Sequence, residues 1–138
     1  MRFDLQLTDF IGIWQISREI EDRISRQAAQ FTGQVTFTED KDQLIYHETG
    51  RLKLLNTPPM TSERRYFWRQ SDAGIAVFFD DDRPFHTFDL ATATSDHWCD
   101  PDQYNVEYGF ASWPVWTAVW TVKGPRKDYT MRSSYVRK

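Results

Sequence analysis

Three charged residues, Arg18, Glu48 and Arg64, lie in segments of the sequence that alternate between apolar and polar side chains. Residues two apart in a β-strand point to the same side, so each of these charges shares a face with large apolar side chains. The apolar residues on those faces are Trp14 and Ile16, Leu44 and Tyr46, and Tyr66 and Trp68. A buried guanidinium needs a carboxylate, a tyrosine oxygen or an anionic ligand as its partner. The pattern therefore predicts charges that are paired inside the fold.

Two interpretations of these charges stay open at the level of sequence. In the first, Arg18, Glu48 and neighbouring tyrosines form a network that satisfies itself and fixes the strand register. In the second, at least one arginine faces a cavity and binds a carboxylate or phosphate through two parallel hydrogen bonds, a geometry that suits the planar guanidinium.

The same parity argument adds aromatic and imidazole side chains to the predicted interior. His86, for example, shares a face with Phe88. An aromatic interior that carries ionisable groups suits a small amphipathic or aromatic acid. The predicted ligand-binding residues are Arg18, Tyr46, Glu48, Arg64, Tyr66, His86, His97, Tyr104, Tyr108, Trp120 and Tyr135.

His97 and Cys99 are candidates for a metal site or a nucleophilic pair, because they share one strand face and aspartates lie nearby. A zinc site needs three or four protein ligands, and this spacing matches no standard zinc pattern. Residues two apart in a strand point the same way without necessarily forming a hydrogen bond, which disfavours a Cys–His nucleophile. We therefore predict no metal and no cofactor, with hydrogen-bonded histidines and an inert thiol.

Short strands must position these candidates, because period-two alternation recurs along the chain and no long helical pattern interrupts it. Aromatic residues, which suit half-buried pleated surfaces, make up 16% of the sequence. Turn-forming residues separate the alternating segments. The predicted strands span 12–20, 31–38, 44–51, 64–69, 75–79, 85–90, 97–99, 104–110, 116–122 and 129–135.

Nine or ten strands joined in succession favour an all-β fold, a single antiparallel up-and-down β-barrel whose closure protects the strand edges. A short helical turn within residues 5–10 is expected to cover one end of the barrel. The length of 138 residues predicts one domain over residues 1–138.

Gly12, Ile13 and Trp14 open the first strand, and this pattern resembles the G-x-W signature of lipocalins and other calycin barrels. In those barrels the tryptophan closes one end. A broader resemblance covers nearly the whole chain and is carried by WQISREIEDR, YHETG, RRYFW, RPFHTFDL, HWCDPDQY and GPRKDYTMRSSY. These segments resemble an uncharacterised family of small bacterial and fungal lipocalin-like domains. The resemblance implies a calycin-like barrel and no particular reaction.

Charge and cysteine content narrow the expected partners. The net charge is −3, from 17 basic and 20 acidic residues scattered along the chain, so nucleic acid is not an expected partner. The first ten residues lack the pattern of a signal peptide, no segment reaches membrane-spanning length, and Cys99 alone allows no internal disulfide. We expect a cytoplasmic monomer or homodimer without a membrane partner.

Three functional hypotheses follow. The leading one is an intracellular module that binds a small-molecule ligand, an amphipathic or aromatic acid oriented by Arg18 and Arg64. The alternative is a cofactor-free enzyme of the lyase or isomerase type, acting on a small carboxylic acid with Glu48 or His86 as general acid or base. The third is a structural or interaction domain with a filled core. The first two hypotheses require a cavity inside the barrel, whereas the third predicts none.

Overall fold

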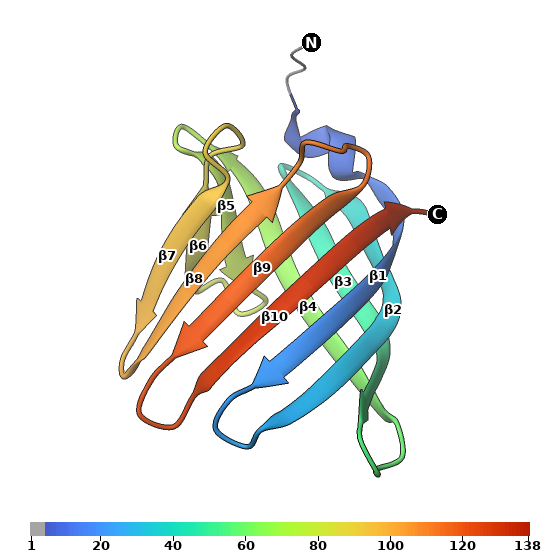
Figure 1. The fold of residues 1–138 in the computed structure, drawn as a ribbon. Helices are drawn as coiled ribbons and strands as arrows, with labels where there is room; N and C mark the ends of the chain where they lie inside the picture. The colour runs from blue at the N-terminus through green and yellow to red at the C-terminus, as the bar shows by residue number, and fades with distance from the viewer. Residues whose placement is uncertain (1–4) are drawn as a thin grey trace.

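Residues 5–138, the part of the chain that the computed structural model describes, form one 3-10 helix and ten strands (Figure 1). The predicted all-β fold with nine or ten strands and an N-terminal helical turn is confirmed. Residues 1–4, which belong to the N-terminal segment that lacks a signal-peptide pattern, lie outside the described residues. The helix is η1 (Leu7–Phe10), and the strands are β1 (Gly12–Asp22), β2 (Gln27–Asp40), β3 (Gln43–Leu54), β4 (Met60–Ser71), β5 (Gly74–Phe79), β6 (Pro84–Phe88), β7 (Thr94–Cys99), β8 (Asp102–Gly109), β9 (Trp116–Lys123) and β10 (Asp128–Arg137).

The strands form one antiparallel sheet in which β1 pairs with β10 and thereby brings the first and last strands side by side. The hydrogen-bonded order is β6-β5-β4-β3-β2-β1-β10-β9-β8-β7. The strands β6 and β7 stand at the two ends of this order and, within the described residues, do not pair with each other. The sheet is therefore a nearly closed barrel, with its ring of hydrogen bonds interrupted at the β6–β7 seam (Figure 1).

The alternation in β1 shows how the sequence pattern produces the barrel interior. Trp14, Ile16 and Arg18 are buried, whereas the residues between them are exposed. Further along, Gly33 of β2 faces Gly50 of β3, and a Cβ on either glycine would collide with the backbone of the opposite strand. The two glycines therefore allow β2 and β3 to approach closely where the sheet coils.

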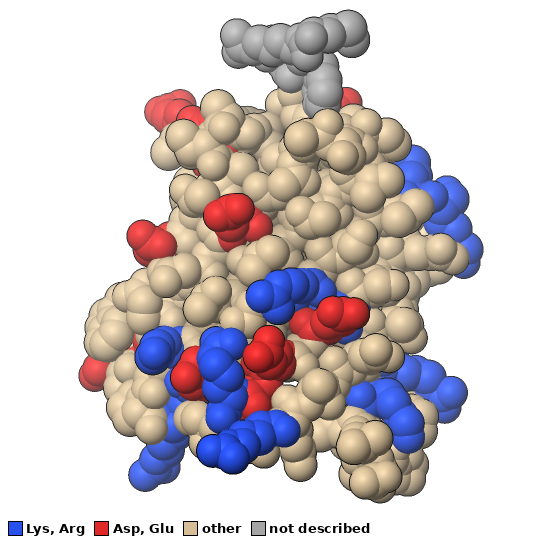
Figure 2. All heavy atoms as spheres, in the orientation of Figure 1, with Lys and Arg blue, Asp and Glu red and all other residues tan. Residues whose placement is uncertain are grey.

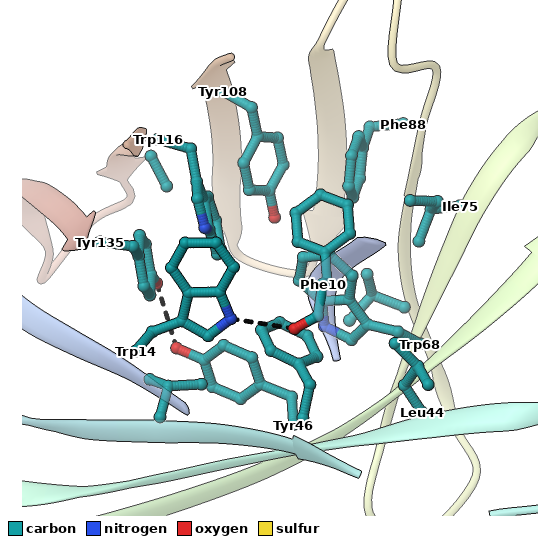
Figure 3. Close-up of a cluster of buried hydrophobic side chains, with 14 of the residues drawn as sticks. Phe10, Trp14, Leu44, Tyr46, Trp68, Ile75, Phe88, Tyr108, Trp116 and Tyr135 are labelled. Atoms are coloured by element: carbon teal, nitrogen blue, oxygen red, sulfur yellow. Dashed lines mark hydrogen bonds between the residues drawn. The ribbon is translucent and has the colours of Figure 1, made fainter. Parts of the chain in front are cut away.

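Aromatic rings fill the end of the barrel that η1 covers (Figure 1, Figure 3). Phe10 and Trp14 are fully buried there, and the Phe10 ring lies edge-on to the Trp116 ring with 5.4 Å between centroids. The Trp14 indole N–H donates a hydrogen bond of 2.9 Å to the Phe10 carbonyl oxygen. The Arg137 guanidinium lies 4.1 Å from the centroid of the Trp14 ring. The tryptophan of the G-x-W pattern thus helps to close one end of the barrel.

The turns that connect β1 to β2, β3 to β4 and β9 to β10 lie at the end opposite η1 (Figure 1). Basic and acidic side chains intermingle near these turns, in the lower part of the face seen in Figure 2. Ion pairs here include Arg23 with Asp128 at 2.8 Å and Lys127 with Asp102 at 2.9 Å. We call this end of the barrel, where the three turns lie, the hairpin end.

We expect Trp14→Ala to lower the free energy of unfolding by about 3–5 kcal/mol, because it removes a large, fully buried side chain and leaves a cavity. Urea unfolding measures the change. Trp98→Ala is the matched control, since Trp98 is 60% exposed and its removal should change stability by less than about 0.5 kcal/mol. A loss below about 1 kcal/mol for Trp14→Ala would show that Trp14 does not hold the closed end together.

Candidate functional site

A cavity of about 240 Å³ lies inside the barrel, and the structure brings all eleven predicted residues together around it. They come from strands on every side of the barrel, so the parity of short segments identified one continuous lining. That these residues bind a ligand stays a prediction. The predicted ligand-binding residues did not include several further lining residues, among them Trp68, Phe79, Phe85, Trp116, Tyr129 and Met131.

The cavity opens at the hairpin end. Arg64, Cys99 and Tyr129 all line it, and they lie close to the β3–β4, β7–β8 and β9–β10 turns respectively. The β7–β8 turn lies at the same end of the barrel as the other two (Figure 1). Arg64 and Cys99 are also exposed to solvent. Residues that contact both the cavity and the solvent mark its mouth.

A buried ion pair joins Arg18 to Glu48 inside the barrel. The guanidinium donates two hydrogen bonds of 2.9 Å to the two carboxylate oxygens, and its Nε donates a third, of 2.8 Å, to the hydroxyl of Ser133. Arg18 is 8% exposed and Glu48 is 1% exposed. The internal partner foreseen by the first interpretation of the sequence is therefore present, and three of the five guanidinium N–H groups are engaged by protein.

Two tyrosines extend this pair, Tyr46 of β3 and Tyr135 of β10, and Figure 3 shows the contact between their hydroxyl groups. The Tyr46 hydroxyl donates a hydrogen bond of 2.6 Å to Glu48 and lies 3.0 Å from the Tyr135 hydroxyl. Because Tyr46 uses its hydrogen on Glu48, Tyr135 must be the donor in the second contact. Burial alone would raise the pKa of the Glu48 carboxyl, but the hydrogen bonds and charge of Arg18 and the Tyr46 hydroxyl outweigh it and lower that pKa. Glu48 is therefore ionised at neutral pH.

Arg64 lies directly opposite Glu48 in the register of β3 and β4 and lines the cavity. The expectation that Arg64 is buried is wrong, because the residue is exposed. Strand parity gives the side to which a residue points and not its depth along the barrel, and Arg64 lies close to the mouth. No carboxylate among the described residues forms an ion pair with Arg64.

His86 is the buried imidazole of the cavity wall. Its Nε2 lies 2.9 Å from the Tyr108 hydroxyl, while its Nδ1 is buried without a hydrogen-bond partner among the described residues. Burial, together with the charge of His97, lowers the pKa of His86 to about 3, so the ring is neutral at physiological pH. The indole N–H of Trp116 is likewise buried and unpartnered within residues 5–138.

Four of the predicted residues, Tyr66, His97, Tyr104 and Trp120, are half-buried and surround the ring of Phe85. Their ring centroids lie 5.1 to 6.3 Å from that of Phe85, with Trp120 the nearest and Tyr104 the farthest. The Tyr104 hydroxyl also accepts a hydrogen bond of 3.1 Å from Lys127. Aromatic surface thus continues from the closed end of the barrel to the mouth.

The structure places the candidate metal and nucleophile residues at the mouth. Cys99 is exposed and lines the cavity near His97, and no hydrogen bond links the two side chains in the described part of the chain. Within residues 5–138, no group of three or more His, Cys, Asp or Glu side chains is arranged to hold a metal ion. None of the helices in the same residues is long and apolar enough to cross a membrane.

Comparison with known protein families assigns the barrel and its cavity to one family. Residues 10–137 match a family described as a family of unknown function, DUF6314. The chain belongs to this family. The match includes all eleven predicted cavity residues, so the lining belongs to the family domain and not to an appended segment.

A comparison with solved structures finds an S-type phycobiliprotein lyase, CPES, from Guillardia theta. The TM-score is 0.59 at 10% sequence identity, and the match covers 96% of this chain and 90% of the lyase chain. A comparison with curated proteins finds no match. At this identity the lyase shows that the barrel fold is shared and shows nothing about shared chemistry.

We expect Arg18→Met to lower the free energy of unfolding by about 3–5 kcal/mol, because it leaves the buried carboxylate of Glu48 without its cation. Replacing both residues, as in Arg18→Met with Glu48→Met, should recover most of this loss, since a buried ion pair can often be exchanged for apolar groups at little cost. Urea unfolding of both variants tests the pair. If the single variant were as stable as the unmodified protein, Glu48 would have another partner or be protonated.

We expect His86 to make the protein less stable in acid. The imidazole has a pKa near 6.5 when the chain is unfolded and about 3 when it is folded, so between these values the unfolded chain binds an additional proton. The free energy of unfolding should therefore fall as the pH decreases below about 6.5, by up to about 1.4 kcal/mol per pH unit from this one group.

Urea unfolding of the unmodified protein and of His86→Asn between about pH 7 and pH 4 isolates this contribution, because other titrating groups are common to both proteins. The unmodified protein should lose stability more steeply than the variant. Parallel curves would show that His86 titrates normally in the folded state.

Proposed function

We propose that the barrel cavity binds a small organic acid whose body is aromatic or amphipathic. One observation carries the proposal: Arg64 lies at the mouth of an aromatic cavity without an ion-pair partner among the described residues. A guanidinium in that position is suited to two parallel hydrogen bonds with a carboxylate.

The charges around the cavity support an anionic ligand. The charges of Arg18 and Glu48 cancel within their buried pair, and Lys127, close to the mouth, is paired with Asp102. Arg64 therefore leaves the lining with a net positive charge. An acid that enters the mouth would supply the missing negative charge in an environment that screens it less than bulk water does.

The remaining lining supports an aromatic or amphipathic body. Rings such as those of Tyr66, Phe79 and Trp120 present apolar faces to the cavity. The unpartnered nitrogens of His86 and Trp116 belong to lining residues, so a polar atom of a ligand or a water molecule near them would satisfy buried groups that lack a partner. A few polar groups in a mainly aromatic lining are typical of small-molecule sites.

Binding is favoured here over catalysis, although the structural neighbour is named a lyase. Glu48 already accepts three hydrogen bonds and is held by Arg18, which leaves it poorly placed to take a proton from a ligand. His86, with its pKa lowered to about 3, is a weak base at neutral pH. Both residues named as general acid or base in the enzyme hypothesis are thus better suited to structural roles.

Isothermal titration calorimetry with 3-phenylpropanoic acid at neutral pH tests the proposal. We expect measurable binding to the unmodified protein and at least about tenfold weaker binding to Arg64→Met, a loss of about 1.4 kcal/mol. Arg65→Met is the matched control, because Arg65 is the next residue of β4, is exposed and does not line the cavity.

The stability of both arginine variants should stay close to that of the unmodified protein, since neither residue is buried. An equal loss of affinity in the two variants would indicate non-specific attraction by net charge and would contradict the role of Arg64. Absence of binding to the unmodified protein across a series of aromatic and aliphatic acids would overturn the proposed function.

A further inference from the structure

The β6–β7 seam is bridged by side chains in place of backbone hydrogen bonds. Phe85 of β6 contributes to this bridge, because its ring lies 5.3 Å from His97 of β7 and 5.1 Å from Trp120 of β9, between centroids. On its own side of the seam, the ring lies 4.6 Å from Phe79 of β5 and 5.8 Å from Tyr66 of β4. Phe85 is therefore one of the side chains through which the two ends of the sheet meet, together with His86 and Phe88, which both contact Tyr108 of β8.

A local irregularity directs Phe85 into the cavity. Val77 pairs with His86 and Phe78 with Pro84, so Phe85 is an additional residue without a partner on β5. Such a bulge changes the direction of a side chain, and it allows Phe85 to line the cavity next to His86, which strict alternation would forbid.

The ring of Phe85 occupies a stacked position that a second aromatic ring could take. It is nearly parallel to Phe79 on one side and to Trp120 on the other, with interplanar angles of 21° and 10°. These separations are those of stacked aromatic pairs. If the Phe85 ring were absent, a flat ring would find aromatic faces on both sides of the space it left.

The volume of the cavity sets the size of the ligand. A cavity of about 150 Å³ is known to hold benzene, and pockets for drug-sized ligands begin at about 300 Å³. The value of about 240 Å³ lies between them and matches one ring with a short substituent. Because Arg64 would hold the acid at the mouth, the body of the ligand must fit inside and cannot extend outwards.

Resting on the proposed function, we infer that the ligand is an acid with a single aromatic ring and that Phe85 is the residue that imposes this limit. Shortening Phe85 extends the cavity across the seam, into the space between Phe79 and Trp120. A two-ring acid, anchored at Arg64, then places its second ring where the Phe85 ring was.

The test compares 3-phenylpropanoic acid with 3-(2-naphthyl)propanoic acid by calorimetry. We expect the unmodified protein to bind the single-ring acid at least about tenfold more tightly than the two-ring acid, and Phe85→Ala to bind the two-ring acid at least about tenfold more tightly than the unmodified protein does. Phe78→Ala is the matched control, because Phe78 lies on the neighbouring strand, does not line the cavity and packs under Arg69.

Phe85→Ala is expected to fold, because Phe85 is half-buried on a five-residue edge strand and has no partner in the sheet register. Phe85→Leu, which keeps an apolar side chain in the seam, provides a second variant and should give an intermediate gain. Circular dichroism establishes that each variant is folded before its binding is measured.

The outcomes separate the two proposals. If the unmodified protein binds the single-ring acid through Arg64 but neither Phe85 variant gains affinity for the two-ring acid, the size limit is wrong and the proposed function stands. Equal binding of the two acids by the unmodified protein also overturns the size limit. If neither acid binds to any variant, the proposed function fails and the inference fails with it.

Discussion

The buried pair of Arg18 and Glu48 is the constraint on which the organisation of the barrel interior depends. Its bonds join β1 to β3 across β2, and the contact with Ser133 adds β10. A slip of one residue in β1 or β3 would turn one of the charges to the outer face and leave the other buried alone, at a cost of several kcal/mol. The pair therefore opposes such slips in the part of the sheet where the two chain ends meet.

The same pair divides the interior into two parts with different physical character. On the side of η1, the rings of Phe10, Trp14 and Trp113 pack against one another and leave a filled core. On the side of the hairpin end, the side chains are polar as well as aromatic and leave a cavity. A buried charge pair can form the boundary when its two partners are hydrogen-bonded to each other, because such a pair tolerates both an apolar and a more hydrated neighbour.

Much of this arrangement could be predicted from the sequence, because strand parity is a strict rule within a regular strand. It placed Arg18 and Glu48 inside and in reach of each other, and it assigned eleven residues to what proved to be one cavity. Parity carries no information on depth, which is why Arg64 was expected to be buried. The bulge at Phe85 has no signal in the alternation, so nothing in the sequence indicated that this ring lines the cavity.

The incomplete closure at the β6–β7 seam was also beyond the reach of the pattern, and it bears directly on what the cavity can do. If backbone hydrogen bonds closed the barrel, the number and tilt of its strands would fix the volume of the interior, and single substitutions would change it little. Closure by side chains makes the space near the seam depend on the rings that fill it, and Phe85 is the ring that is nearly parallel to both Phe79 and Trp120. In a barrel closed in this way, a substitution at Phe85 would change the space inside the cavity while the Arg18–Glu48 pair and the aromatic end, which stabilise the fold, remain as they are. The fold shared with the lyase at 10% identity is consistent with this division, because a common barrel can persist while the residues that line it differ.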